Sequence, residues 1–147
     1  MNPTKLGESL WELHLENVRA LEQIVEASQT RGESGMLLYL YHVGRPMYPG
    51  ELTEKLGLTT GRIANILKVL EKEGLVARTP DAMDKRRVQV ALTPQGEALA
   101  QRRNRDAVEF HVRLISQLQS DEAQQFLNML KRMVSVVDDG AGQTPSR

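Results

Sequence analysis

No cysteine occurs among the 147 residues of this chain. Disulfide bridges, thiolate metal ligands and thiol-based redox switches all require cysteine, so the sequence excludes them, together with peroxide sensing through a reactive thiol. The 19 basic and 19 acidic side chains cancel to a formal net charge of zero. A neutral chain is not expected to coat nucleic acid or anionic membranes without selectivity.

Long apolar runs are missing from the start of the chain. Charged residues interrupt the first thirty positions every few residues, which argues against a signal peptide or a membrane span there. We therefore expect a soluble, cytoplasmic protein with no membrane partner. The length is that of about one domain and allows a real hydrophobic core.

The sequence also lacks the motifs of common enzymes. It has no Gly-rich phosphate loop, no nucleophile elbow and no His/acid spacing typical of a hydrolytic site, so neither an enzymatic function nor a cofactor is predicted. His14, His42 and His111 form no His-x-x-x-His pair and no dense cluster with glutamates. This pattern favours structural or solvated histidines over metal ligands, although a metal-responsive protein stays open as an alternative.

Two short segments with helical apolar spacing occupy the middle of the chain. Glu51 to Leu56 and Thr60 to Glu73 are separated only by the corner Gly57-Leu58-Thr59. A joint this short between two helices predicts a helix-turn-helix.

A predicted β-hairpin follows this pair. Gly74 should end the second helix as a left-handed cap, and Leu75 to Thr79 and Arg87 to Leu92 have the composition of strands joined by the polar segment PDAMDKRR. Val88, Val90 and Leu92 alternate with more polar residues, so one face of the second strand can pack on the helices. A hairpin behind a helix-turn-helix is typical of a wing.

Long helices are expected on the N-terminal side. Asn2 and Pro3 can start a helix whose apolar residues recur at helical spacing up to a stop near Gly32. So long an apolar stripe cannot be buried by one small domain, which suggests packing on a second subunit. Glu33 to Val43 is apolar enough to be the central core helix.

Two further helices are expected after the wing. Thr93 and Pro94 predict the cap and first residue of a second long helix. Ser120 begins a last helix, with acidic residues in its first turn and an apolar stripe ending at Val137. The tail DDGAGQTPSR has no periodicity and is predicted to be disordered.

The order of these motifs resembles the MarR family of bacterial transcriptional regulators. The resemblance is carried by LEKEGLV at Leu70 to Val76, by the wing pattern D-x-x-D-x-R, and by V-x-L-T-x-x-G up to Gly96. The wing pattern is formed by Asp81, Asp84 and Arg86. Two positions depart from the family: Tyr48-Pro49-Gly50 replaces small polar helix-starting residues, and Met83 replaces a basic residue that would offer a phosphate contact.

The predicted fold class is mainly α with a small β-hairpin. A winged helix-turn-helix at 33–96 is flanked by an N-terminal dimerisation helix at 1–32, by C-terminal dimerisation helices at 97–137 and by the tail at 138–147. The resemblance implies a homodimeric regulator, most often a ligand-relieved repressor, on a pseudo-palindromic operator in double-stranded DNA. A winged helix that docks on protein without binding DNA is the alternative.

Charge is distributed in agreement with DNA binding. The segment from Thr60 to Val90 carries seven basic and four acidic residues, a net charge of +3, whereas Met1 to Thr30 carries two and five, a net charge of −3. Positive charge is therefore gathered on the predicted DNA-reading segment.

The helix from Thr59 onward is the predicted reader of the major groove. Arg62 and Asn65 are the candidate base-reading side chains, because Arg pairs with guanine and Asn with adenine through two hydrogen bonds. Thr59 would cap the helix beside a phosphate, and Lys68 would contact another phosphate. Thr60 and Gly61 complete the exposed face, where a small residue lets the backbone approach DNA.

The wing tip is the second predicted contact. By resemblance, Arg86 enters the minor groove, whose negative potential attracts arginine, and Asp84 orients its guanidinium through a charge-assisted pair. Lys85 and Arg87 would add phosphate contacts. A weak surface pair between Asp84 and Arg86 without a role in DNA binding is the simpler alternative.

A small aromatic or amphipathic effector is implied by the resemblance, because family members commonly release DNA when such a molecule binds between the dimerisation helices and the winged domain. The candidate lining residues offer polar groups among apolar walls. They are Trp11, His14, Tyr39, His42 and Phe110. Aromatic residues at helical spacing are, however, more often part of the core.

Overall fold

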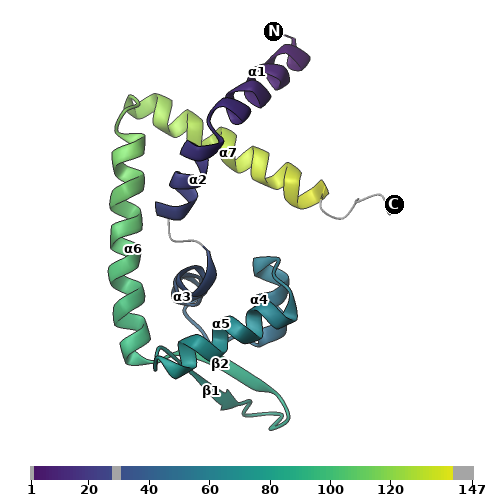
Figure 1. The fold of residues 1–147 in the computed structure, drawn as a ribbon, viewed down its shortest axis with the longest axis vertical. Helices are drawn as coiled ribbons and strands as arrows, with labels where there is room; N and C mark the ends of the chain where they lie inside the picture. The colour runs from purple at the N-terminus through teal and green to yellow at the C-terminus, as the bar shows by residue number, and fades with distance from the viewer. Residues whose placement is uncertain (1, 28–30, 141–147) are drawn as a thin grey trace. The chain divides into compact units, whose positions relative to one another are not determined.

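A computed structural model describes residues 2–27 and 31–140 of the chain, and of residues 27, 139 and 140 it describes the backbone only. The elements follow in the order α1 to α5, β1, β2, α6 and α7 (Figure 1). The chain divides into two compact units, Met1–Val108 and Glu109–Arg147. The fold class predicted from the sequence, mainly α with one β-hairpin, is confirmed, and no helix in the described part of the chain is long and apolar enough to cross a membrane.

The winged helix-turn-helix lies within the first unit. Its helices are α3 (Gly32–Val43), α4 (Pro49–Leu56) and α5 (Thr60–Lys72), and its hairpin is β1 (Val76–Pro80) with β2 (Val88–Leu92). The strands pair antiparallel, with Val76 opposite Leu92 and Pro80 opposite Val88. Met47 forms an additional bridge to Val90, which ties the segment before α4 to the hairpin.

The end of α5 has the geometry predicted from Gly74. This glycine has a φ of +71°, in the left-handed region that a residue without Cβ enters at little cost. Its N–H donates to the Glu71 carbonyl at 3.0 Å, and the Leu75 N–H donates to the Leu70 carbonyl at 2.9 Å. These two bonds form a Schellman motif, which turns the chain from the reader helix into the wing.

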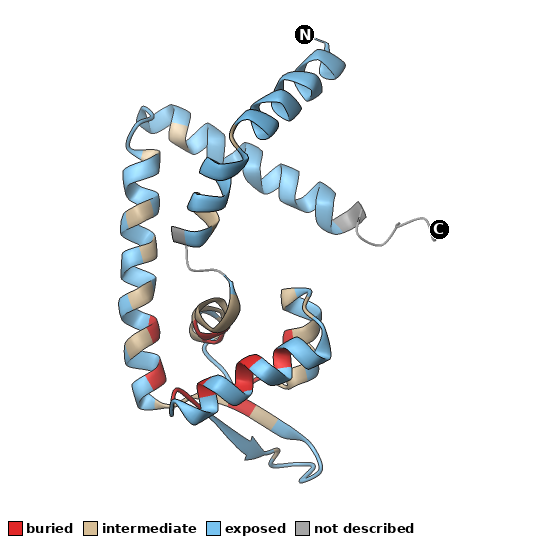
Figure 2. Cartoon of the chain, viewed as in Figure 1, coloured by how far each residue is buried: buried red, intermediate tan, exposed pale blue. Residues whose placement is uncertain are grey.

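A single hydrophobic core holds these elements together. Its thirteen buried residues come from α3, α4, α5, the hairpin with its neighbouring residues and the start of α6 (Figure 2). The expected inward face of α5 is buried. Each of its residues is at most 1% exposed: Ile63, Ile66, Leu67 and Leu70. Because the core fixes one face of α5, the opposite face must be presented to solvent.

The N-terminal segment differs from the single long helix predicted for it. The structure contains α1 (Pro3–Glu16) and α2 (Val18–Ala27), separated at Asn17. The Asn17 amide Nδ2 donates to the Leu13 carbonyl at 2.8 Å, and its backbone departs from helical geometry. A short amide side chain competes with the helix for backbone groups, which explains the break.

The C-terminal helices are α6 (Pro94–Ile115) and α7 (Ser120–Gly140). Thr93 caps α6 as predicted, since its Oγ1 accepts the Gly96 N–H at 3.0 Å; the same hydroxyl donates to the Gly74 carbonyl at 2.6 Å. The tail prediction is wrong for residues 138–140, which continue α7. Nothing in the sequence stops a helix before Gly140, and residues 141–147 lie outside the described part.

Candidate nucleic-acid interface

The N-terminus of α5 is arranged as a DNA-reading helix would require. Thr59 has extended backbone, and its Oγ1 accepts the Arg62 N–H at 3.2 Å, so the predicted cap is confirmed. A helix start with exposed N–H groups and the positive end of the helix dipole is a natural place for a phosphate.

All ten residues predicted to contact DNA are exposed on the winged unit. They are Thr59, Thr60, Gly61, Arg62, Asn65, Lys68, Asp84, Lys85, Arg86 and Arg87. Six lie at the cap and on the outer face of α5, and four lie in the loop of the wing. Their roles on DNA stay predictions.

The candidate readers on α5 differ in how far their side chains are engaged. The Arg62 guanidinium lies beside the first residue of α3, with Nη2 only 3.9 Å from the point where a Cβ on Gly32 would stand. In the described part of the chain, neither the Asn65 side chain nor the Lys68 side chain makes a hydrogen bond or an ion pair. The Arg62 guanidinium thus lies near the start of α3 while the residue stays exposed.

A self-contained hydrogen-bond network shapes the wing loop. Asp81 Oδ1 accepts the N–H groups of Met83 at 2.7 Å and of Asp84 at 3.0 Å. The Asp81 N–H donates to the Arg87 carbonyl at 2.8 Å, and the Arg87 N–H donates to the Asp84 carbonyl at 3.0 Å. Asp81 is therefore the residue around which the loop closes.

The expected pairing of Asp84 with the Arg86 guanidinium is not present. Asp84 Oδ1 instead accepts the backbone N–H of Arg86 at 3.0 Å, and the two side chains form no ion pair in the described part of the chain. A short carboxylate reaches the backbone two residues further along more easily than it reaches the end of a long side chain. The backbone is thus fixed at the tip, while the Arg86 side chain is exposed.

Arg87 packs on a residue outside the hairpin. Its guanidinium carbon stands 3.7 Å from the centre of the Tyr48 ring, a cation–π contact. The predicted phosphate contact of Arg87 would therefore start from a cation that already lies on an aromatic face.

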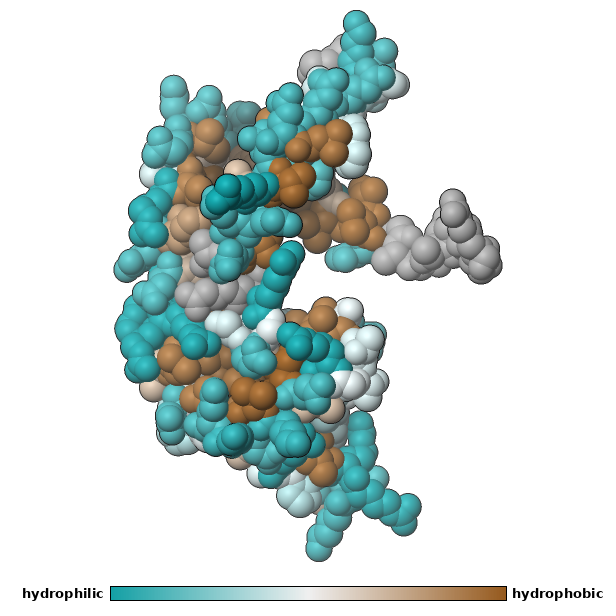
Figure 3. Space-filling view, viewed as in Figure 1, coloured by the Kyte–Doolittle hydropathy of each residue, from teal (hydrophilic) through white to brown (hydrophobic). Residues whose placement is uncertain are grey.

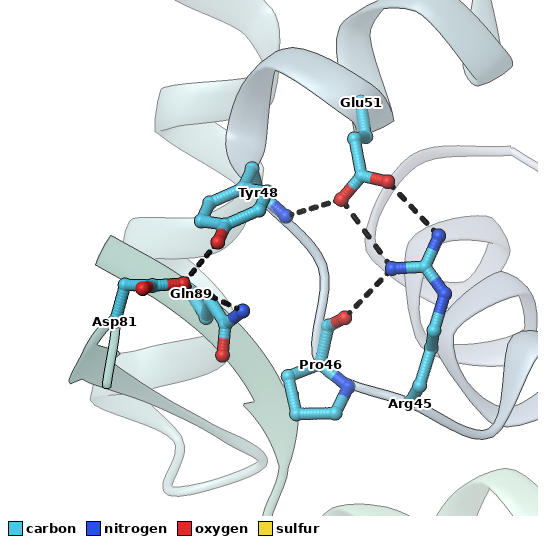
Figure 4. Close-up of polar contacts among 6 residues, drawn as sticks. All are labelled: Arg45, Pro46, Tyr48, Glu51, Asp81 and Gln89. Atoms are coloured by element: carbon cyan, nitrogen blue, oxygen red, sulfur yellow. Dashed lines mark hydrogen bonds and ion pairs between the residues drawn. The ribbon is translucent and has the colours of Figure 1, made fainter. Parts of the chain in front are cut away.

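Tyr48 connects the first turn of α4 with the wing (Figure 4). Its hydroxyl donates to Asp81 Oδ2, an oxygen that also accepts Gln89 Nε2 at 3.2 Å. The hydrogen bond to Asp81 is the main cause of the raised pKa of Tyr48, and the same bond, followed by the two backbone N–H groups, lowers the pKa of Asp81. Both shifts agree with a neutral phenol that donates to an ionised carboxylate.

The backbone of Tyr48 is itself held by charged groups. Glu51 Oε2 accepts the Tyr48 N–H at 2.8 Å, and Glu51 Oε1 pairs with Arg45 Nη2 at 2.9 Å. Arg45 also donates to the Pro46 carbonyl at 3.0 Å (Figure 4). The hydrogen bond from Arg45 and then that from the Tyr48 N–H lower the pKa of Glu51. Sequence reasoning missed this cluster, and the only signal was that Tyr48-Pro49-Gly50 departs from the family pattern.

The predicted effector-lining residues lie in several environments. Trp11 and His14 stack on each other on α1, with ring centroids 5.8 Å apart. Tyr39 packs against the core and His42 is exposed on α3, whereas Phe110 belongs to the second unit, where it lies edge-on to His111. The effector site therefore stays a prediction.

A cavity of about 760 Å³ occurs elsewhere in the first unit. Residues of α2, α3 and α5 line it, together with Arg31, Glu73, Leu75 and Arg103 of α6, and none of the five predicted effector residues does. Four of its lining side chains are carboxylates. They are Glu22, Glu26, Glu33 and Glu73. Within the described ranges, no group of three or more His, Cys, Asp or Glu side chains is placed to hold a metal ion.

Comparison with known proteins agrees with the winged fold. The model of the MarR family matches residues 30–87, which include α3 to α5, β1 and the wing loop. The HTH-type transcriptional regulator SarZ of Staphylococcus aureus (strain USA300) is 32% identical over 87 residues, 58% of this chain and 56% of that protein. The aligned part thus spans about half the length of this relative.

Solved structures cover more of the chain. MepR, a transcription regulator of the Staphylococcus aureus multidrug efflux pump MepA, is 28% identical with a TM-score of 0.63 over 84% of this chain and 96% of its own. MepR in its DNA-binding conformation has a TM-score of 0.65 at 28% identity over 86% and 98%. Wild-type MarR from E. coli has a TM-score of 0.63 at 25% identity over 90% and 97%. The sequence motifs, the winged fold and these similarities lead to one conclusion: over residues 30–87, which hold most of its winged part, the chain matches the MarR family.

Proposed function

We propose that this protein is a transcriptional regulator that binds double-stranded DNA sequence-specifically, through α5 in the major groove and the wing in the minor groove. The observation that carries the proposal is that all ten predicted contact residues are exposed at the reader helix and the wing loop of one unit. A winged helix that only docks on protein would not need basic side chains at both places. Its action on DNA would take place in the cytoplasm.

The wing should contribute to affinity for any DNA sequence, whereas α5 should set the sequence preference. Arg86→Ala removes a cation expected in the minor groove, so binding should weaken by a similar factor for all sequences. Asn65→Ala removes a base-reading amide, so it should cost about 1 to 3 kcal/mol at one base pair and relax the preference there. Arg62→Ala should behave like Asn65→Ala.

Competition binding to a pool of related duplexes measures both effects at once. Equal, sequence-independent losses from all three variants would count against this division of roles. Lys131→Ala is the control and should leave the binding profile unchanged. It removes an exposed cation on α7, far along the chain from the winged unit.

We further propose that the active form is a homodimer on a pseudo-palindromic operator. Apolar side chains on α7 recur at helical spacing and yet are 43–69% exposed (Figure 3). They are Phe126, Leu127, Leu130, Met133, Val134 and Val137. Such a stripe is costly in water, and a second copy of the chain would bury it.

A dimer also doubles the few base contacts of one reader helix across half-sites about one helical turn apart. Sedimentation velocity should give a dimer for the wild type. Leu130→Lys should give a monomer that binds a full operator much more weakly, because its affinity is that of a single reader. A monomeric wild type with full operator affinity would contradict the proposal.

Relief of repression by a small molecule is the third part of the proposal. One solved structure of MepR holds ethidium bromide, which supports a small-molecule effector in this chain. The candidates for binding it are the five side chains predicted from the sequence, Trp11, His14, Tyr39, His42 and Phe110, and the cavity of about 760 Å³. An effector can relieve repression only if it binds the DNA-incompetent state more tightly, so a true effector must raise the dissociation constant of the operator complex.

A further inference from the structure

In the part of the chain that the structure describes, the wing loop has one side-chain partner outside its own hairpin. Among the described residues, Tyr48 alone reaches the segment 81–87 from elsewhere by a hydrogen bond or a cation–π contact, through Asp81 and Arg87. Every other hydrogen bond of this segment stays within the hairpin. The orientation of the tip relative to the helices thus depends on the strands and on this one side chain.

Tyr48 is itself held on both sides. Immediately before it, Met47 exchanges two backbone hydrogen bonds with Val90, at 2.9 and 2.7 Å. Immediately after it, Pro49 begins α4, and Glu51 fixes the Tyr48 N–H at 2.8 Å. The phenol is therefore presented to the loop from a backbone that has little freedom to move (Figure 4).

We infer that Tyr48 is a positioning residue for DNA binding: its hydroxyl holds Asp81, and through Asp81 it sets where the wing tip carries Arg86. The inference rests on the proposed function. It assigns to Tyr48 a role through another residue and needs no contact between the tyrosine and DNA.

The chain of contacts from Tyr48 to the tip is short. One carboxylate oxygen of Asp81 accepts a hydrogen bond from the Tyr48 hydroxyl, and the other accepts hydrogen bonds from the backbone N–H groups of Met83 and Asp84. Asp84 in turn accepts the backbone N–H of Arg86 at 3.0 Å. A change at the first link alters the position of the tip without removing any charged group that would contact DNA.

Tyr48→Phe isolates this link. The ring remains under the Arg87 guanidinium, and the loop keeps its own hydrogen bonds, so the fold is expected to persist. A tip that is less fixed has to be ordered when DNA binds, which lowers affinity. Loss of one hydrogen bond to a charged group should weaken operator binding roughly three- to tenfold, by a similar factor for all sequences.

A double-mutant cycle with Arg86→Ala tests the mechanism. If Tyr48 acts by placing Arg86, Tyr48→Phe weakens binding in the wild type and has no further effect in the Arg86→Ala background. The same factor in both backgrounds would show that Tyr48 acts by another route and would overturn the inference. Tyr41→Phe is the matched control, because Tyr41 lies on α3 and, among the described residues, makes no hydrogen bond or cation–π contact with the segment 81–87, and it should leave affinity unchanged.

Hydrogen exchange supplies a readout that needs no DNA. The amides of Met83 and Asp84 should exchange faster in Tyr48→Phe than in the wild type, and unchanged exchange would overturn the inference. A wild type that binds no duplex selectively would defeat the proposed function, and this inference with it. Selective wild-type binding that Tyr48→Phe retains in full would defeat this inference alone.

Discussion

Replacing Gly96 by alanine should destabilise the protein strongly. Gly96 is the third residue of α6 and is buried against the chain that leaves α5. A Cβ added there would stand 1.8 Å from the Leu75 carbonyl oxygen and 2.8 Å from its carbonyl carbon. A carbon and a carbonyl oxygen approach to roughly 3.3 Å, so the helix and the chain at Leu75 would have to separate by more than an ångström.

The cost follows from what this separation breaks. The Leu75 carbonyl accepts the Thr93 N–H at 3.1 Å, and the Thr93 hydroxyl joins the Gly74 carbonyl to the Gly96 N–H. Overpacking with the loss of part of this network should lower the free energy of unfolding by about 3 kcal/mol or more. For a chain of this size, that corresponds to a fall in Tm of roughly 6 to 12 °C.

Thermal unfolding followed by far-ultraviolet circular dichroism measures this change, at one fixed protein concentration because association shifts Tm. Gly50→Ala is the matched control: Gly50 lies at the second position of α4, and its added Cβ would meet nothing within 4 Å. That variant should be unchanged or more stable by up to about 1 kcal/mol. Equal stability of Gly96→Ala and the wild type, or an equal loss in both variants, would contradict this prediction.

Three further predictions concern the core, the reader helix and the wing. Leu67→Ala should lower the free energy of unfolding by about 2 to 5 kcal/mol, because Leu67 is 1% exposed. Val69 on the same helix is 39% exposed, so Val69→Ala should lower the free energy of unfolding far less. A denaturant titration of both variants measures the difference. Gly61→Ala should leave Tm unchanged or higher, because nothing lies within 4 Å of its added Cβ, while anisotropy should register weaker DNA binding if the α5 backbone approaches DNA there. The pKa of Asp81 is lowered chiefly by the Tyr48 hydroxyl. The stability that this carboxylate contributes is therefore fully present above its pKa in the unfolded chain, near pH 4. It is lost as the pH falls through the lower pKa that Asp81 has in the folded protein. Asp81→Asn should therefore weaken the dependence of stability on pH below about pH 4, and an unchanged acid unfolding curve would contradict this.

The helix-turn-helix and the wing could be predicted because their signals are local. Ile63, Ile66, Leu67 and Leu70 have helical spacing, and all four are buried. Gly74 marks the end of α5 because a left-handed residue there strongly favours glycine. These signals depend on the nearest few residues, which a sequence displays directly.

The break at Asn17 could not be predicted from periodicity. The apolar residues of α1 and α2 keep helical spacing across it, and only the local hydrogen bond from the Asn17 side chain to Leu13 marks the interruption. A single asparagine inside a helical pattern is compatible with either outcome.

The cluster around Tyr48 depends on contacts between distant parts of the chain. Tyr48 and Asp81 are 33 residues apart, and no spacing rule brings them together. The interpretation of Asp84 and Arg86 as a side-chain pair was wrong because a backbone N–H lies nearer to the carboxylate. The motif identified the residues, whereas their partners are set by the folded loop.

The proposed function requires that this winged helix reads DNA. Fluorescence anisotropy of the purified protein with a duplex from upstream of its own gene, beside a shuffled duplex and across a salt series, tests it most directly. We expect tighter binding to the upstream duplex, with affinities that fall steeply as salt rises because phosphate contacts release counterions. Equally weak binding to both, followed by no enrichment of any sequence from a random duplex pool, would contradict the claim.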